Sequence, residues 1–493
     1  MQPLLYWQSG GFLMKNWLLQ RVDLTPNRLA VRFNAQELTF KELNQRVQKL
    51  VRKLGAPLAA EQRVAIITPN NLDGYLLILA VQQLGKTIVF LNRRLSQREL
   101  AYQLQDAAIR VLIQDDDYEL RFTGISQLTF SAIEALPEQA YHAVATFDLD
   151  DVATIMYTSG TTGNPKGVMQ TFGNHFYSAI GSALNLGMLP GDVWIAAVPL
   201  FHISGFSIMT KSLIYGMGVS LYDHFDVDAI NAELQNGQAS TISVVPVMLK
   251  NMLAALPANT TYHPNFRTVL LGGGPTDMPT LERASKLGVA IVQSYGMTET
   301  ASQVVALAGE DAVRKLGSVG KPLFPVEIRV KTTADAQTGR VQVKSPTLTV
   351  GYLNNEAKYQ AAFDDGWFDT GDMGWFDEEG YLYIQGREGD MISSGGENVF
   401  PDEIESAYAA LPEIETIAVA GVPDEKWGAV PVAYIKFVPG QSLTQATLRA
   451  FGRQQLAHFK VPAKFVTVTD FPRTASGKLQ RHLLAEQSFE IIP

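Results

Sequence analysis

The stretch from Tyr157 to Gly167 is the densest group of residues in the chain that could do chemistry. It reads YTSGTTGNPKG, and its three glycines let backbone N–H groups approach an anion closely, while four Ser or Thr hydroxyls and one ammonium supply further donors. An ordinary surface loop rarely combines glycine, hydroxyls and lysine at this density. We therefore predict a polyphosphate-binding loop with the following ligands: Thr158, Ser159, Gly160, Thr161, Thr162 and Lys166.

The same residues argue against other kinds of nucleotide or metal site. If Gly160 is aligned with the first glycine of a Walker A loop, Pro165 replaces a required glycine and Gly167 replaces the Ser or Thr that ligands magnesium. No dinucleotide fingerprint opens a βαβ unit, and the seven histidines form no HExxH pair. Because the chain has no cysteine, any thioester chemistry must take its sulfur from a partner molecule.

Four further segments with chemical character follow the loop in order. They are Tyr295–Glu299, Phe368–Asp372, Gly386–Arg387 with Ser394–Glu397, and Pro472–Lys478. Together with the loop they resemble the adenylate-forming superfamily, which includes acyl- and aryl-CoA synthetases, peptide-synthetase adenylation domains and firefly luciferase. The resemblance covers the chain from about Met14. It implies that a substrate carboxylate attacks the α-phosphate of ATP, and that a thiol such as that of coenzyme A then attacks the acyl-adenylate.

The resemblance also implies roles for individual residues. Thr298 would donate to the α-phosphate, and Glu299 would ligand Mg²⁺, which prefers oxygen ligands. Lys478 would bridge the substrate carboxylate and the α-phosphate. It belongs to a basic stretch, 449–481, with seven Lys or Arg and one Asp. His202 would orient that carboxylate, with a structural histidine as the alternative. The adenosine would be held by Gly272, Gly273 and Tyr295 at the base and by Asp372 and Arg387 at the ribose.

Two of these interpretations leave alternatives open. Gly272–Gly274 is equally well explained as a structural turn. The resemblance also implies a hinge at the Gly386–Arg387 motif, which departs from the commonest pattern of the superfamily. An Asp or Lys usually stands two residues after the hinge-motif arginine, whereas here that position is Gly389, followed by Asp390. Glycine can absorb a large change in φ and ψ, so we expect Gly389 to act as a pivot that moves Lys478 away before the second step.

The acid itself is suggested by a narrower resemblance. The segments Pro199–Ile208, Lys211–Gly216, Leu271–Pro275 and Ser294–Gln303 are similar to those of o-succinylbenzoate–CoA ligases of menaquinone synthesis. Such a substrate has a second carboxylate, which is costly to bury without a partner. If a helix starts near Ser204, then Ser204, Ser207 and Lys211 share one face. We expect these three residues to bind that carboxylate, with Ser302 contributing. The alternative is that the substrate is a plain fatty or aromatic acid and that Lys211 lies on the surface.

Other functions that share the adenylation step stay open at this point. An enzyme that loads a carrier protein and a luciferase-like oxygenase would use the same ATP motifs. A non-catalytic nucleotide-binding regulator is disfavoured, because one chain carries Lys166, Glu299, Asp372 and Lys478 together. ATP, Mg²⁺ and coenzyme A are therefore the expected cofactor and co-substrates.

Buried strands at a regular spacing are expected to position these residues. Continuous apolar runs separated by helical patterns indicate largely parallel sheets in two α/β lobes. The predicted strands are Arg63–Ile67, Thr87–Leu91, Ala108–Leu112, Val152–Met156, Val193–Val198, Val219–Tyr222, Thr241–Val245, Thr268–Leu271 and Ala290–Val292. After about residue 316, alternating polar and apolar positions predict a small antiparallel sheet or barrel.

The domains expected are an N-terminal ATP- and acid-binding region, 1–386, and a mobile α+β domain, 387–493, with 1–13 as a possible upstream extension. The 493 residues are 46% hydrophobic and 18% charged, which indicates a globular chain. With 40 basic and 49 acidic residues the net charge is −9, which disfavours nucleic acid as a partner. No apolar run is long enough to span a bilayer, and we expect a cytoplasmic protein. The sequence leaves its oligomeric state open.

Overall fold

The computed structural model describes residues 6–8, 11–158, 165–257, 260–274, 276–332, 337–394, 397–424, 427–456, 458–473, 479–484 and 490–492. The chain forms two compact units. The first contains Met1–Lys315, Val319–Glu327 and Lys344–Gly366, and the second contains Leu316–Ser318, Ile328–Val343 and Trp367–Pro493. The boundary expected at residue 386 and the mobility of the C-terminal domain remain predictions.

The first sheet of the first unit carries the predicted phosphate loop. Its strands are β5 (Arg63–Ile67), β6 (Thr87–Phe90), β7 (Val111–Gln114), β8 (Ser126–Thr129), β10 (Val152–Thr158), β11 (Lys166–Thr171) and β21 (Gly351–Tyr352). They lie in the order β21-β11-β10-β6-β5-β7-β8. The strands from β10 to β8 are parallel, whereas β11 is antiparallel to both of its neighbours.

A second sheet of the same unit is also parallel at its centre. Its strands are β3 (Leu29–Phe33), β4 (Gln36–Thr39), β12 (Val193–Ala196), β13 (Gly218–Leu221), β14 (Thr241–Val244), β15 (Thr268–Leu271), β16 (Ile291–Met297), β17 (Ser302–Leu307) and β18 (Ser318–Pro322). The order is β18-β17-β16-β15-β14-β12-β13-β3-β4, and the strands from β16 to β3 are parallel. A third, antiparallel sheet contains β1 (Tyr6–Gln8), β2 (Gly11–Lys15) and β9 (Thr146–Asp148).

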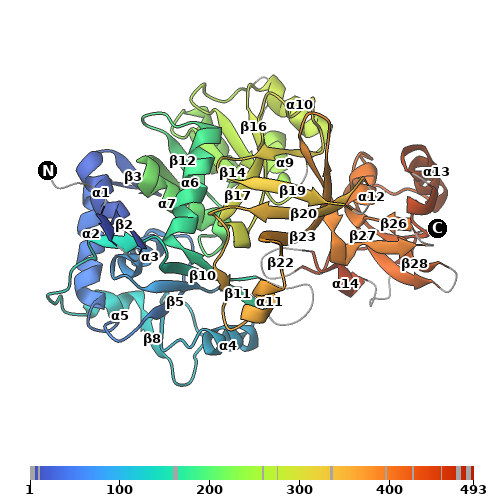
Figure 1. Ribbon diagram of the computed structural model, residues 1–493. Helices are drawn as coiled ribbons and strands as arrows, with labels where there is room; N and C mark the ends of the chain where they lie inside the picture. The colour runs from blue at the N-terminus through green and yellow to red at the C-terminus, as the bar shows by residue number, and fades with distance from the viewer. Residues whose placement is uncertain are drawn as a thin grey trace. The chain divides into compact units, whose positions relative to one another are not determined.

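Helices pack against these sheets (Figure 1). They are α1 (Trp17–Leu24), α2 (Phe40–Leu54), α3 (Leu72–Gln83), α4 (Gln97–Asp106), α5 (Phe130–Ala135), α6 (Phe172–Leu186), α7 (Ile203–Tyr215), α8 (Val227–Gln235), α9 (Pro246–Ala255), α10 (Met278–Lys286) and α11 (Glu356–Gln360), with a short strand β22 (Phe363–Asp364). Capping boxes start α2 at Thr39, α4 at Ser96 and α6 at Thr171. Helices α6 and α7, drawn in green in Figure 1, pack against each other.

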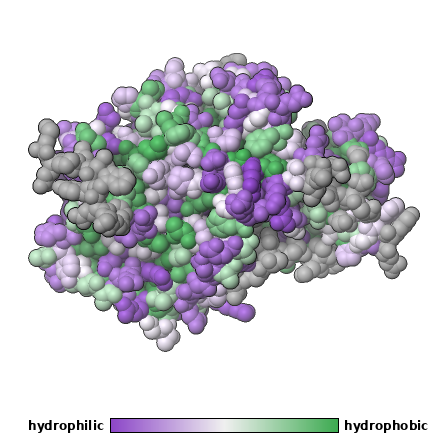
Figure 2. Space-filling view, in the orientation of Figure 1, coloured by the Kyte–Doolittle hydropathy of each residue, from purple (hydrophilic) through white to green (hydrophobic). Residues whose placement is uncertain are grey.

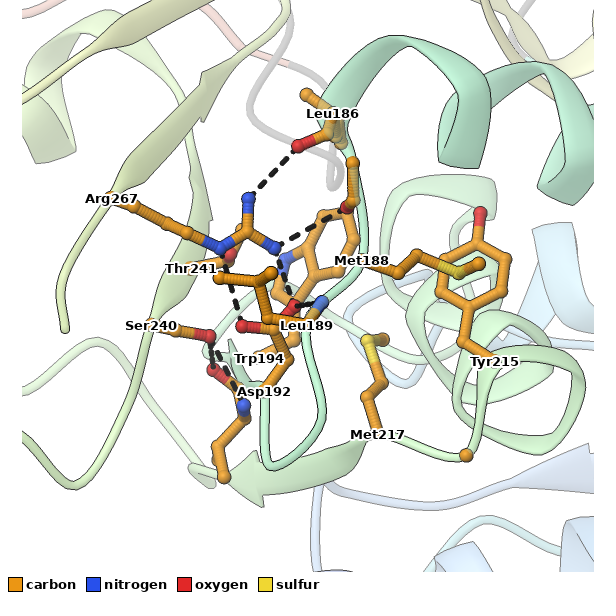
Figure 3. A pocket seen from close by; sticks show the side chains of 13 residues that line it. Leu186, Met188, Leu189, Asp192, Trp194, Tyr215, Met217, Ser240, Thr241 and Arg267 are labelled. Atoms are coloured by element: carbon orange, nitrogen blue, oxygen red, sulfur yellow. Dashed lines mark hydrogen bonds and ion pairs between the residues drawn. The ribbon is translucent and has the colours of Figure 1, made fainter.

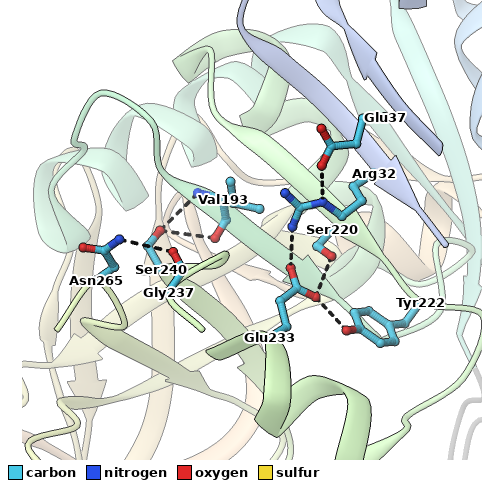
Figure 4. A network of polar contacts seen from close by, with 9 residues as sticks. All are labelled: Arg32, Glu37, Val193, Ser220, Tyr222, Glu233, Gly237, Ser240 and Asn265. Atoms are coloured by element: carbon cyan, nitrogen blue, oxygen red, sulfur yellow. Dashed lines mark hydrogen bonds and ion pairs between the residues drawn. The ribbon is translucent and has the colours of Figure 1, made fainter. Parts of the chain in front are cut away.

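A buried carboxylate joins α8 to the second sheet (Figure 4). Glu233 accepts hydrogen bonds from the hydroxyls of Ser220 (2.9 Å) and Tyr222 (2.6 Å). Arg32 of β3 donates to the same carboxylate at 3.1 Å and to Glu37 at 2.6 Å. Because its partners satisfy the buried charge, this network is structural. Figure 2 shows polar and apolar residues mixed over the face of the first unit that it presents, as is usual for folded proteins.

The second unit contains two groups of paired strands, of which the later one is mixed, since β28 and β29 are parallel. The strands β19 (Glu327–Lys331), β20 (Gly339–Lys344), β23 (Trp367–Phe376) and β24 (Leu382–Arg387) lie in that order. The turn η2 (Glu388–Asp390) follows, and then come β25 (Ile392–Ser394), β26 (Glu397–Val399), α12 (Pro401–Tyr408), β27 (Ile414–Asp424), β28 (Gly428–Phe437), α13 (Gln445–Gln455), η3 (His458–Lys460), β29 (Lys464–Thr467), α14 (Arg481–Leu484) and β30 (Glu490–Ile491). The later strands order as β26-β25-β28-β29-β30, with β27 against β28.

The expected α/β class is confirmed, and one strand was misplaced. The strand predicted at Ala108–Leu112 begins instead at Val111. Ala108 has a φ of 50° and ends the turn after α4, where Ile109 donates to the carbonyl of Leu104. Apolar side chains in that turn imitate a strand in the sequence. None of the helices formed by the described residues combines the length and apolar character that a membrane span requires.

Candidate functional site

The predicted phosphate loop connects two antiparallel strands. Thr158 at the end of β10 pairs with Lys166 at the start of β11. Residues 159–164, which include the expected ligands Ser159, Gly160, Thr161 and Thr162, lie outside the described residues. The Lys166 ammonium lies 4.5 Å from the centre of the Tyr352 ring, a cation–π distance. The hairpin therefore places Thr158 and Lys166 side by side at one end of the paired strands β10 and β11.

The turn that carries Thr298 and Glu299 lies against β11, the strand that begins at Lys166. Glu299 is only 7% exposed, and its Oε1 accepts a hydrogen bond from the Tyr352 hydroxyl at 3.1 Å. Lys166, Tyr352 and Glu299 thus form one contiguous group. Among the described residues no cluster of three or more His, Cys, Asp or Glu could hold a metal ion. A single buried carboxylate nevertheless suits Mg²⁺, which is commonly held by one or two carboxylates together with substrate phosphates.

Three different segments hold the backbone of this turn, η1 (Thr298–Thr300). The amide of Gln170 donates to the carbonyl of Thr298 at 2.6 Å. The backbone N–H of Thr349 donates to the carbonyl of Glu299 at 2.7 Å, and the Ser178 hydroxyl donates to the carbonyl of Ala301 at 2.8 Å. Such support is needed, because the next two residues have positive φ.

Those two residues, Ala301 and Ser302, have φ values of 52° and 129°. Non-glycine residues pay a conformational penalty in this region and keep it only when their surroundings impose it. Gly296 accommodates the resulting path, since a Cβ there would lie 2.1 Å from the carbonyl oxygen of Ser302. The backbone next to Thr298 and Glu299 is therefore fixed rather than adaptable, and Ser302, a predicted substrate contact, sits at its strained end.

The glycines predicted beside the adenine base follow β15. Gly272 donates to the carbonyl of Val244 at 3.0 Å, and Gly273 has a φ of 81°, which favours glycine. A Cβ at Gly272 would have Ser294 Oγ as its nearest neighbour, at 3.6 Å. Tyr295 lies next to Ser294 in β16, which pairs with β15. The glycine turn after β15 and Tyr295 on β16 thus lie on neighbouring strands, and their contact with an adenine base remains a prediction.

His202 caps the amino end of α7. It precedes Ile203 with an extended backbone, and its ring lies tilted against the ring of Phe201, with the two ring centres 4.6 Å apart. Burial, with a contribution from Arg94, lowers the pKa of His202 to about 4. The loop before it is fixed by Asn70, which donates to the carbonyl of Val198 at 2.8 Å and accepts from the N–H of Leu200 at 2.9 Å. A neutral imidazole is therefore available for hydrogen bonding at physiological pH.

The helix predicted to start near Ser204 is α7, and its three predicted contacts differ in burial. Ser204 is exposed, whereas Ser207 is buried and donates to the carbonyl of Ser204 at 3.2 Å. Lys211 is 1% exposed, so the alternative of a surface lysine is wrong. Its ammonium lies 5.1 Å from the centre of the Trp194 ring, and burial lowers its pKa to about 7. No hydrogen-bond or ion-pair partner for it occurs among the residues described.

The predicted ribose residues form an ion pair in the second unit. Arg387 Nε lies 2.8 Å from Asp372 Oδ1, and Arg387 Nη1 donates to the carbonyl of Thr370 at 2.8 Å. Asp372 is buried, and its N–H donates to the Thr370 hydroxyl at 3.1 Å. The strand register itself pairs Asp372 with Arg387. The two residues are thus brought together by β23 and β24.

The hinge residues lie in η2, between two ion pairs. Glu388 accepts from Arg340 at 2.7 Å, and Asp390 lies 3.5 Å from Arg481. A Cβ at Gly389 would have no neighbour within 4 Å, and its φ is not in the left-handed region. The observed backbone therefore does not itself require glycine at this position. Lys478 lies outside the described residues.

A pocket elsewhere in the first unit contains none of the predicted site residues (Figure 3). It lies at the amino ends of β12, β13, β14 and β15, where Arg267 donates to the carbonyl of Leu186 and pairs with Asp192. The predicted ligands follow the carboxyl ends of strands, where α/β proteins usually bind substrates. Trp194 lines this pocket and also faces Lys211.

Sequence reasoning missed the residues that support the predicted ligands. Tyr352, Gln170 and Trp194 each contact a predicted ligand through the fold and not through sequence spacing. Gln303 is buried, and neither of its amide atoms has a hydrogen-bond partner among the described residues. No motif marks these residues. Only the predicted strand Val193–Val198, in which Trp194 lies, indicated the burial of one of them.

Comparisons with known proteins show the family to which the chain is similar. Residues 18–353 match the family described as AMP-binding enzyme, and residues 403–478 match the AMP-binding enzyme C-terminal domain. The chain is 46% identical to a 2-succinylbenzoate–CoA ligase from Listeria monocytogenes, covering 96% of this chain and 99% of the relative.

Two solved structures of o-succinylbenzoate CoA synthetase from Bacillus subtilis are also similar. The complex with the acyl-adenylate intermediate OSB-AMP has a TM-score of 0.92 at 38% identity and covers 97% of this chain and 99% of that one. The complex with ATP and magnesium ion has a TM-score of 0.90 at 38% identity, with coverage of 96% and 99%.

Proposed function

Because the chain belongs to the AMP-binding enzyme family, we propose that it is the ATP-dependent ligase that converts 2-succinylbenzoate and coenzyme A into 2-succinylbenzoyl-CoA for menaquinone synthesis. Full-length similarity to 2-succinylbenzoate–CoA ligases carries this proposal. The buried ammonium of Lys211 gives it a physical reason, because a second substrate carboxylate would supply the counter-charge that the interior lacks.

The first step joins the acid to AMP. An oxygen of the succinyl carboxylate attacks the α-phosphorus of ATP, the new C–O–P linkage forms, and the bond to the β-phosphate breaks to release pyrophosphate. Two anions approach each other, so the step depends on positive charge and N–H dipoles and not on a nucleophilic side chain. Lys166 and Thr158 would hold the β- and γ-phosphates, Thr298 the α-phosphate, and Lys478 the charge that develops between acid and phosphate.

Magnesium, when bound, neutralises phosphate charge, and Glu299 is the residue that would hold it. Tyr352 orients one oxygen of Glu299 through its hydroxyl, which leaves the other oxygen for the ion. Asp372 would accept hydrogen bonds from the ribose hydroxyls, with Arg387 fixing the carboxylate. Neutral His202 would donate to the reacting carboxylate at the start of α7.

The second step transfers the acyl group to sulfur. The thiolate of coenzyme A attacks the carbonyl carbon of the adenylate, a C–S bond forms, and the C–O bond breaks to release AMP. The thiol proton leaves to solvent. Since the chain has no cysteine, the sulfur comes from coenzyme A alone. ATP and coenzyme A are both intracellular metabolites, which is the reason for placing the reaction in the cytoplasm.

Pyrophosphate release, measured with and without coenzyme A across a panel of acids, tests this function. Turnover with 2-succinylbenzoate should require coenzyme A and yield the CoA thioester, detected by mass. Benzoate and medium-chain fatty acids serve as controls. Sustained release only in the presence of a carrier protein, or oxygen uptake without thioester, would favour the carrier-loading or oxygenase alternatives instead.

A further inference from the structure

Three buried polar side chains connect the phosphate-loop hairpin to the turn that carries Thr298 and Glu299. The Nε2 atom of His175 lies 2.9 Å from the Thr154 hydroxyl. That hydroxyl lies 2.8 Å from Oε1 of Gln170, whose amide nitrogen donates to the carbonyl of Thr298 at 2.6 Å. Thr154 and Gln170 are fully buried, and His175 is 2% exposed. The three residues are called the relay below.

Only one arrangement of protons satisfies all of these contacts. Gln170 must direct its NH₂ at Thr298, since the opposite orientation would place two oxygen acceptors together. Its oxygen then needs the single proton of the Thr154 hydroxyl. The hydroxyl oxygen must in turn accept from His175, so the imidazole proton is on Nε2.

The surroundings of His175 agree with this order. Burial alone lowers its pKa to about 3, so the ring is neutral and carries one proton. Its other nitrogen, Nδ1, is buried and has no hydrogen-bond partner in the part of the chain that the structure describes. Burying an acceptor lone pair without a hydrogen-bond partner costs less free energy than burying an N–H donor without one. Phe206 of α7 packs edge-on against the ring at 5.1 Å, which holds its plane.

We propose that Thr154, Gln170 and His175 are positioning residues that fix Thr298 and Glu299 relative to the phosphate loop, so that the α-phosphate and magnesium contacts are preformed. Thr154 is on β10, which enters the loop, and Gln170 is on β11, which leaves it. The relay therefore connects both strands of the hairpin to the turn whose next residues have strained φ. The proposal rests on the adenylate-forming function above, and it concerns the first step only.

The variant Thr154→Val removes the hydroxyl and keeps the shape of the side chain. It leaves both the His175 N–H and the Gln170 oxygen without partners. The KM for MgATP in pyrophosphate release is expected to rise about 10-fold or more, because small displacements of positioning groups are costly. Thioester formation from supplied acyl-adenylate should change by less than about 2-fold, since that step no longer needs the bound triphosphate.

Two further variants separate positioning from a general packing effect. Thr154→Ser restores the hydroxyl and should recover the KM. Thr268→Val makes the same exchange at a buried threonine of β15 outside the relay and should leave the ratio of the two half-reactions as in wild type. Gln170→Met tests the other end of the relay if Thr154→Val does not fold. When both fold, the double variant should lose no more than the worse single variant, because the residues act as one unit.

Several results would overturn the relay. They are a wild-type KM for MgATP in folded Thr154→Val, equal loss in both half-reactions, or failure of Thr154→Ser to recover the KM. Failure of the proposed function looks different, because wild type itself would then form no thioester with 2-succinylbenzoate. In that case the relay can still be measured with whichever acid wild type adenylates.

Discussion

Lys211 holds an ammonium group in the protein interior, and no carboxylate lies beside it among the described residues. Its ammonium lies 5.1 Å from the centre of the Trp194 ring, and burial lowers its pKa to about 7. A substrate carboxylate bound nearby would attract the charged form and raise this pKa again. The residue is therefore expected to reduce stability in exchange for recognition of a diacid.

This pKa predicts a pH dependence that differs between two substrates. The value of kcat/KM for 2-succinylbenzoate should fall as the pH rises through about 7, because free enzyme then loses the Lys211 proton. The kcat should fall only at higher pH, since the bound carboxylate keeps the lysine charged. A monoacid such as 4-phenyl-4-oxobutanoate should lack this fall. Profiles from pH 5.5 to 9 for both acids are the measurement, and parallel curves would count against Lys211.

Burial of the Lys211 charge should also make the free energy of unfolding depend on pH. Below about pH 7 Lys211 is protonated in both native and unfolded chains, so the burial penalty is fully present. Between about 7 and 10.5 only the unfolded chain keeps the proton, and stability rises with pH. Lys211→Met should therefore raise the unfolding free energy by a few kcal/mol at pH 6. Denaturant unfolding at pH 6 and pH 9.5 checks this, and an advantage that does not shrink at the higher pH would refute the burial argument.

Helix α7 shows which structural features the spacing of residues could predict and which it could not. The spacing of Ser204, Ser207 and Lys211 predicts a helix, which runs from Ile203 to Tyr215. Spacing places residues on one face, but it does not tell what covers that face. The packing of α7 against α6 and β12 buries Lys211 and leaves Ser204 exposed.

The relay illustrates a second limit of what short sequence motifs can predict. Short motifs mark residues that touch a ligand, because chemistry fixes their types and local order. Thr154, Gln170 and Thr298 are joined only by the pairing of strands that are distant in sequence, and a buried glutamine or threonine looks like any other strand residue. The strand that carries Thr154 was predictable from its continuous apolar run, which parallel sheets require, whereas β11, which carries Gln170, is antiparallel to both neighbours and was not predicted.

The hinge element η2 allows a matched pair of variants. Gly389→Ala should be tolerated, since its Cβ would have no neighbour within 4 Å. Gly389→Pro fixes φ and should slow thioester formation from supplied acyl-adenylate about 10-fold more than it slows adenylation, if rotation at this residue is needed. Rapid-quench measurement of both half-reactions decides the matter. Equal behaviour of the Ala and Pro variants would place the pivot elsewhere.

At the scale of the whole molecule, the predicted residues are divided between the two units. Lys166, Thr298, Glu299 and α7 belong to the first, whereas Asp372, Arg387, the hinge and Lys478 belong to the second. A reaction in two steps can use this division, because each step needs a different set of charges.

Lys478→Ala tests the division directly. Adenylation should fall about 100-fold or more, because the developing charge loses its counter-ion. Thioester formation from supplied acyl-adenylate should persist. Lys464→Ala removes an exposed lysine of the same basic stretch and is the control. Comparable losses in both half-reactions for Lys478→Ala would contradict its assignment to the first step.

We propose that this enzyme activates one carboxylate of a diacid while it recognises the other. The most direct measurement compares kcat/KM for CoA-thioester formation from 2-succinylbenzoate and from 4-phenyl-4-oxobutanoate, which lacks the ring carboxylate. Wild type should prefer the diacid by about 100-fold or more, as expected when a buried charged group loses its partner, and Lys211→Met should narrow that preference. If wild type uses the two acids equally well, the diacid assignment is wrong, whatever the variant does.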